Sequence, residues 1–123
     1  MSKKDREKAI NAIGAGRVVV GASAWLAPRL SGRLFGLDPE GNPQAPYVGR
    51  LFGARDVVLG LGAIRAPRRQ KNTWLVAGLA CDVADTAAGA MAAVRGTLPL
   101  PAAVMVTATA AGFAAAGYAL TQQ

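Results

Sequence analysis

Four apolar stretches, separated by short polar segments, account for most of this chain. They cover roughly residues 10–26, 47–64, 73–94 and 98–120, and the first could begin earlier, near Asp5. A helix rises about 1.5 Å per residue, so each stretch has roughly the length needed to cross about 30 Å of hydrocarbon. The apolar-polar alternation of membrane strands is absent. The pattern predicts an all-α fold, a bundle of four transmembrane helices.

The segments between these stretches differ in character. Proline and glycine are dense from Pro28 to Pro46, which predicts a loop. Residues 65–71 form a basic turn, and residues 95–101 form a short link. We expect one integral membrane domain over residues 1–123. A soluble, alanine-rich helical bundle is the alternative, but residues 97–123 carry no charged side chain and a soluble helix needs a polar face.

Composition supports the membrane interpretation and narrows the chemistry. The chain is 52% hydrophobic and only 17% charged, whereas soluble domains average about 25% charged. Histidine is absent and Cys81 is the single cysteine, which excludes His- and Cys-based zinc sites, His-dependent nucleophilic catalysis and an intrachain disulfide. We expect no metal and no cofactor. Cys81, beside Asp82, is interpreted as a small packing residue.

The distribution of positive charge predicts the orientation. The net charge is +7, but the basic residues lie in short clusters without an aromatic platform for bases, so we expect no nucleic-acid partner. Cytoplasmic loops of membrane proteins are rich in Lys and Arg. An orientation with both termini in the cytoplasm places eight Lys and Arg inside, and three outside at Arg29, Arg33 and Arg95. The eight are Lys3, Lys4, Arg6, Lys8, Arg65, Arg68, Arg69 and Lys71.

The turn Arg65, Arg68, Arg69 and Lys71 is therefore predicted to form a cytoplasmic basic patch. Anionic lipid headgroups attract such clusters. We expect this face to bind anionic lipid or to dock an acidic protein partner. The alternative is that these charges only orient the chain during insertion.

Six charged residues fall inside the predicted spans and sum to zero. Charged groups there are costly, and they usually face the bundle interior or a water-filled cavity. Counted at about 1.5 Å per residue from the basic side, five lie between about 10 and 18 Å deep, and the sixth, Arg50, lies at about 21 Å. We predict a polar layer inside the membrane made by Arg17, Arg50, Arg55, Asp56, Asp82 and Asp85.

Helical spacing predicts how this layer is paired. Asp82 and Asp85 are three residues apart and share one helix face, whereas Arg55 and Asp56 are adjacent and must face different neighbours. We expect Arg55 and Arg17 to reach Asp82 and Asp85, with Asp56 turned elsewhere. The layer either fixes helix register only or forms a polar cavity for a proton, ion or ligand.

Small residues and tryptophans fit the same picture. Gly49 and Gly53 form a small-xxx-small pair, which predicts close helix packing, with homodimerisation as the alternative. Trp25 and Trp74 fall at span ends, where interfacial anchors are found.

Three motifs carry a resemblance to a known family: Gly-x-Gly-Arg at 14–17, Gly-Arg-Leu-Phe-Gly-Ala-Arg-Asp at 49–56, and Cys-Asp-Val-Ala-Asp at 81–85. With them the chain resembles small four-helix membrane proteins of unknown function that are distantly similar to DoxX-like proteins. The resemblance implies the four-helix fold and places Arg55, Asp56, Asp82 and Asp85 in characteristic motifs. DoxX itself is associated with an oxidoreductase complex, which favours an accessory subunit by analogy.

Three functions are compatible with the sequence. The first is a non-enzymatic accessory or interaction subunit of a membrane complex. The second is a small oligomeric proton- or ion-coupled transporter. The third is a membrane enzyme acting on a lipid or isoprenoid, with Asp82 or Asp85 as general acid or base. The sequence indicates no complete catalytic set.

Overall fold

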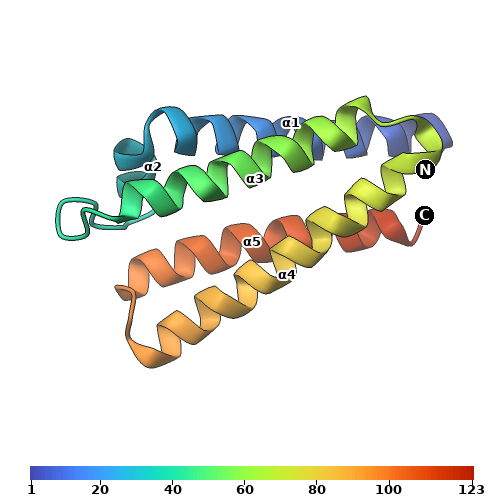
Figure 1. Cartoon of the computed structure of the whole chain (residues 1–123). Helices are drawn as coiled ribbons and strands as arrows, with labels where there is room; N and C mark the ends of the chain where they lie inside the picture. The colour runs from blue at the N-terminus through green and yellow to red at the C-terminus, as the bar shows by residue number, and fades with distance from the viewer.

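The computed structural model describes all 123 residues and is entirely helical. Its α-helices are α1 (Lys3–Leu26), α2 (Pro28–Leu34), α3 (Ala45–Arg65), α4 (Lys71–Arg95) and α5 (Leu100–Thr121), and a single 3₁₀ turn, η1 (Arg68–Gln70), precedes α4. The four long helices correspond to the four predicted stretches. Both termini lie at one end of the molecule, together with η1 (Figure 1). We call this end the basic end, after the eight Lys and Arg residues listed above.

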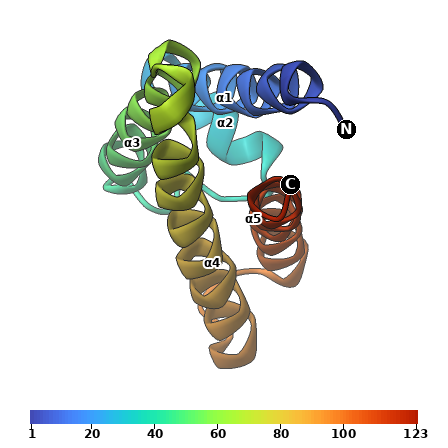
Figure 2. The same ribbon diagram turned by 90° about the vertical axis from the view of Figure 1, so that its right-hand side faces the viewer.

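The long helices form two antiparallel pairs. α1 packs mainly on α3, and α4 packs mainly on α5, with smaller contacts between the pairs. The two pairs are closest near the termini and diverge toward the other end (Figures 1 and 2). A cluster of Ile10, Ala63, Leu75 and Leu120, one from each long helix, holds the pairs together.

The start of α1 lies seven residues before the apolar pattern begins. Ser2 Oγ accepts a hydrogen bond from the Asp5 backbone N–H at 3.1 Å, and the Asp5 carboxylate accepts from the Ser2 N–H at 3.3 Å. This capping box satisfies backbone donors that a helix N-terminus leaves free. Hydropathy therefore found only the apolar part of a longer helix.

The predicted loop at 28–46 is wrong for its first part, where the chain forms α2. Pro28 is at the first helical position, where its missing N–H costs nothing. The chain then turns at Gly36, whose φ of 81° suits glycine. Gly36 packs on the start of α5 at Ala102, which is fully buried. The turn thus contacts the second helix pair.

Close approach of α1 and α3 depends on facing glycines. A Cβ on Gly14 would lie 2.9 Å from the Gly60 carbonyl oxygen, and one on Gly21 would lie 2.5 Å from the Gly53 carbonyl oxygen. Small residues let helix backbones approach in this way. Gly53, one member of the predicted small-xxx-small pair, therefore packs against α1 of the same chain.

Many large apolar side chains lie on the surface. Only 20 of 123 residues are buried, and large apolar side chains such as Val83, Met91, Val104 and Met105 face outward. Three helical segments are long and apolar enough to cross a membrane: Lys3–Leu26, Arg68–Arg95 and Leu100–Thr121. α3 is of similar length but contains Arg50, Arg55, Asp56 and Arg65.

Candidate functional site

Five of the six charges predicted for the polar layer interact with one another in the bundle interior. Arg17 comes from α1, Arg55 and Asp56 from α3, and Asp82 and Asp85 from α4. Arg17 pairs with Asp82, and Arg55 pairs with Asp85 and approaches Asp56. We call these five residues the polar core. The matched depths along three helices were enough to predict this grouping, because helical rise is nearly constant.

Arg17 and Asp82 form the buried pair of the polar core. The Arg17 Nη1 and Nη2 atoms donate to Asp82 Oδ1 and Oδ2 at 2.9 and 2.5 Å, and about 5% of each side chain is exposed. Gly78 makes room for the guanidinium, since a Cβ there would lie 2.7 Å from Nη2. Phe113 of α5 covers it, with its ring centroid 5.1 Å from Cζ. The pair therefore links α1 to α4 beneath α5.

Arg55 and Asp85 form a second, more open pair. The Arg55 Nη1 and Nη2 atoms donate to the two Asp85 carboxylate oxygens at 3.1 and 2.6 Å. About a third of each side chain is exposed. The predicted contact of Arg55 with Asp82 or Asp85 is thus present, and it joins α3 to α4.

Asp56 is the third carboxylate of the polar core and has no such partner. It is 6% exposed, and its Oδ1 atom has no hydrogen-bond partner. The nearest cation is Arg55, whose Nη2 lies 3.5 Å from Oδ1. Asp56 makes no hydrogen bond to Arg17, and it packs against Gly21 of α1, but it also approaches the Arg55 guanidinium that binds Asp85 on α4.

Arg50 lies outside the polar core, contrary to the prediction. Its side chain is exposed at the end opposite the termini, where Nε donates to the Trp25 carbonyl oxygen at 3.1 Å. Counting residues gives depth but not the direction of a long side chain. Arg50 extends from the first turns of α3 toward the bundle end and binds the C-terminal carbonyl region of α1, where a helix dipole favours a cation.

Lys71 is also placed differently from the prediction of an exposed basic patch. It is 4% exposed, and its Nζ atom donates to the carbonyl oxygens of Ala63 and Ile64 at 2.6 and 2.8 Å and to Asn11 Oδ1 at 2.9 Å. Lys71 therefore caps the C-terminus of α3 by binding its free carbonyl groups. Arg65, Arg68 and Arg69 are exposed, as expected for a patch.

Arg6 has a similar structural contact at the same end. Its Nε atom donates to the Leu120 carbonyl oxygen at 3.0 Å, and its Nη2 atom donates to Asn72 Oδ1 at 3.0 Å. Arg6, Arg50 and Lys71 thus each bind the C-terminal carbonyl groups of another helix. Their charges carry a structural role that no sequence motif indicated.

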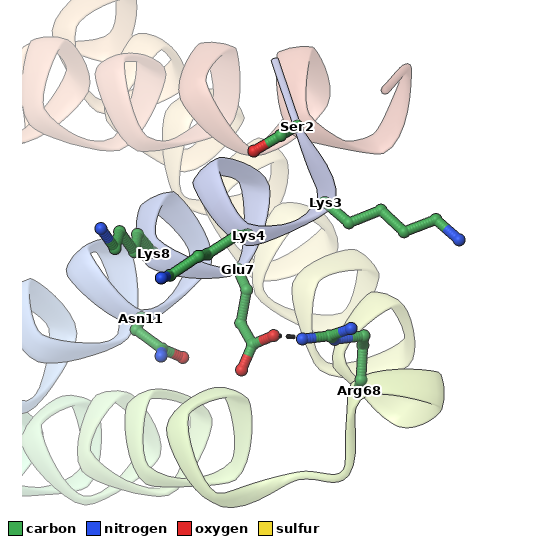
Figure 3. Close-up of a pocket in the computed structure, with 7 residues that line it drawn as sticks. All are labelled: Ser2, Lys3, Lys4, Glu7, Lys8, Asn11 and Arg68. Carbon is green, nitrogen blue, oxygen red and sulfur yellow. Dashed lines mark hydrogen bonds and ion pairs between the residues drawn. The ribbon is translucent and has the colours of Figure 1, made fainter.

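The basic end also holds a shallow polar hollow of about 540 Å³ (Figure 3). Arg68 Nε donates to Glu7 Oε2 at 2.8 Å, which fixes the turn against α1. The lining has no apolar side chain and consists of Ser2, Lys3, Lys4, Glu7, Lys8, Asn11 and Arg68. Sequence reasoning placed these charges at one end but did not predict the hollow.

Comparison with protein-family models, curated proteins and solved structures gives no match for this chain. The similarity to DoxX-like proteins therefore stays a prediction, and function is inferred from the geometry alone.

Proposed function

We propose that this chain is a membrane protein with four spanning helices that acts as a non-enzymatic accessory or interaction subunit and binds anionic lipid headgroups at its basic end. The observation that carries this proposal is the internal pairing of both core arginines. Arg17 and Arg55 each bind a carboxylate of α4 through two nitrogens, so neither guanidinium group is free to bind an anionic substrate. The paired arginines and aspartates therefore join α1 and α3 to α4, which is a structural role.

The path of the chain supports α3 as the fourth span. α1 runs away from the basic end, whereas α4 begins at that end (Figure 1). If α1, α4 and α5 cross the membrane, α3 must cross it too. Its 21 residues span roughly 32 Å at the helical rise. Its interior charges Arg55 and Asp56 face the polar core, while Arg50 and Arg65 lie near its ends.

The charge distribution supports an orientation with both termini in the cytoplasm. The basic end carries the eight Lys and Arg residues, and the opposite end carries Arg29, Arg33, Arg50 and Arg95. This bias follows the positive-inside rule. The cytoplasmic leaflet carries the anionic lipids, so in this orientation the basic end lies at anionic headgroups.

The hollow at the basic end suits a phosphate group. Lys3, Lys4 and Lys8 form no hydrogen bond or ion pair within the chain, so their ammonium groups are free to bind an anion. Each basic residue near an anionic surface contributes about 1 kcal/mol. Lys71 and Arg6 are excluded from this role by their contacts with backbone carbonyl groups.

Lipid retention tests the proposal. Protein reconstituted with equal phosphatidylglycerol and phosphatidylcholine, then extracted in mild detergent, should retain mainly phosphatidylglycerol by native mass spectrometry. Lys4→Gln with Lys8→Gln should lose this preference, and added salt should weaken it because exposed charges are screened. Arg29→Gln with Arg95→Gln removes the same charge at the opposite end and should retain it.

Purification from the native host tests the accessory role. A protein partner present in stoichiometric amount is the expected result. If an acidic protein binds through Lys4 and Lys8 while lipid retention is unselective, the headgroup assignment is wrong and the accessory role stands. Purification as an isolated chain with catalytic turnover of a lipid would contradict the accessory role.

A further inference from the structure

The polar core carries an unbalanced charge. With Arg50 at the bundle end, the core contains two arginines and three aspartates, which leaves one negative charge if every group is ionised. An unpaired charge in a low-dielectric interior is very costly, and such a group is normally neutralised. The most buried carboxyl group that lacks a hydrogen-bonded cation is therefore the one expected to be neutralised.

Geometry identifies the carboxylate that has no counter-charge of its own, because the one cation it approaches, Arg55, is shared with Asp85. Asp82 and Asp85 each accept two hydrogen bonds from an arginine. The Asp56 side chain is 8% exposed, and its Oδ1 atom is buried and accepts no hydrogen bond. Of the three carboxyl groups, Asp56 alone lacks a bidentate partner.

No cation in the surroundings of Asp56 is without another carboxylate partner. Arg17 of α1 is near enough to interact electrostatically, but its fork is occupied by Asp82. Arg55 of α3 is committed to Asp85. From α4, Asp82 adds a like charge, and α5 has no charged residue. Where α1 packs against it, Asp56 meets Gly21, which contributes no side chain.

We propose that Asp56 is a proton-binding site whose carboxyl group is neutral and exchangeable in the folded protein. Binding forms the O–H bond of the acid from the carboxylate and a proton of water, and release returns a hydrated proton. The Arg55–Asp85 pair, about one-third exposed, lies beside it. Proton binding at Asp56 is independent of what binds at the basic end.

Proton release also affects Arg55. Its Nη2 atom lies 2.6 Å from Asp85 Oδ2 and 3.5 Å from Asp56 Oδ1. A newly formed Asp56 carboxylate attracts this guanidinium away from Asp85. The protonation state of Asp56 therefore sets the partner of Arg55, and with it the contact between α3 and α4.

Infrared difference spectroscopy of the full chain in nanodiscs tests the site. A protonated carboxylic acid has a C=O stretching band that a carboxylate lacks. With ¹³C-labelled aspartate, wild type at neutral pH should show this band, and it should disappear as pH rises. Asp56→Asn should abolish the band and leave the melting temperature equal to or above wild type, since Asn resembles the neutral acid. The control Asp38→Asn, at an exposed loop position, should retain the band.

The wild-type titration is decisive even if Asp56→Asn fails to fold. Absence of the band at neutral and acidic pH in folded wild type would overturn the proposal, as would its persistence in Asp56→Asn. Sodium-dependent melting of wild type, lost in Asp56→Asn and without any acid band, would assign the charge compensation to a metal cation and would also overturn it.

Discussion

Arg17 on α1 binds Asp82 on α4 through both of its terminal nitrogens, at 2.9 and 2.5 Å, with almost no exposure of either side chain. The two residues are 65 positions apart in sequence. Together with the Arg55–Asp85 pair and the hydrogen bonds of Lys71, this contact joins the α1–α3 pair to the α4–α5 pair, and it is the most buried of the ion pairs that do so. Loss of one partner leaves a charge in a closed interior.

Asp82→Asn or Arg17→Gln should each destabilise the protein by about 3–5 kcal/mol, the usual cost of breaking a buried pair. Asp85→Asn should cost less, because the Arg55–Asp85 pair is about one-third exposed. The melting temperature in mild detergent measures both. The double variant Arg17→Gln with Asp82→Asn should recover part of the loss, and simple additivity of the two losses would show that the residues are not coupled.

Gly21→Ala should separate α1 from α3. The new Cβ would lie 2.5 Å from the Gly53 carbonyl oxygen and 2.8 Å from the Val57 nitrogen. Both are backbone atoms, which can move aside only if the helix itself is displaced. We expect a loss of about 1–3 kcal/mol from overpacking. Gly112→Ala is the matched control, since nothing lies within 4 Å of its Cβ position. It should stabilise α5 by about 0.5–1 kcal/mol, and equal effects of the two variants would refute the packing model.

Lys71→Met should lower stability, whereas Arg69→Gln should not. Lys71 Nζ makes three hydrogen bonds at the C-terminus of α3, while Arg69 is exposed. Hydrogen bonds to a charged group contribute about 1.5–3 kcal/mol each, so a loss of at least about 2 kcal/mol is expected. Chemical denaturation in detergent provides the comparison. Equal stability of the two variants would contradict the buried position of Lys71 and would indicate that it belongs to the exposed patch.

Both termini should be inaccessible from outside intact cells. In a Cys81→Ala background, Gln123→Cys should not react with an impermeant maleimide until the membrane is opened. Asn42→Cys, in the exposed connection before α3, should react at once. Labelling of Gln123→Cys from outside would contradict the orientation and, with Asn42→Cys also labelled, would mean that an even number of α3, α4 and α5 cross the membrane, which excludes the four-span topology.

The sequence was most informative about helix length and about the depth of each residue along its helix axis. Apolar length located the four long helices, and the constant rise per residue brought Arg17 to Asp82 and Arg55 to Asp85 at matched depth. Helix ends were less predictable, because the polar first turns of α1 are held by the capping box of Ser2 and Asp5, and hydropathy does not detect it.

Errors arose where a long side chain leaves the level of its own Cα atom. Arg50 extends to the carbonyl oxygen of Trp25, and Lys71 turns inward to Ala63 and Ile64. Both contacts depend on where another helix ends in space, which residue counting along one helix does not provide. α2 was missed for a different reason, since the density of proline and glycine hid a short helix that starts at Pro28.

The contact between Arg6 and the Leu120 carbonyl oxygen limits when α1 and α5 can be joined during synthesis. The two residues are 114 positions apart, and the acceptor lies in the last turn of α5. During synthesis Arg6 is therefore made long before its acceptor. This contact between α1 and α5 can therefore form only after α5 has been synthesised, so the bundle cannot be fully assembled while the chain is still being extended through α4.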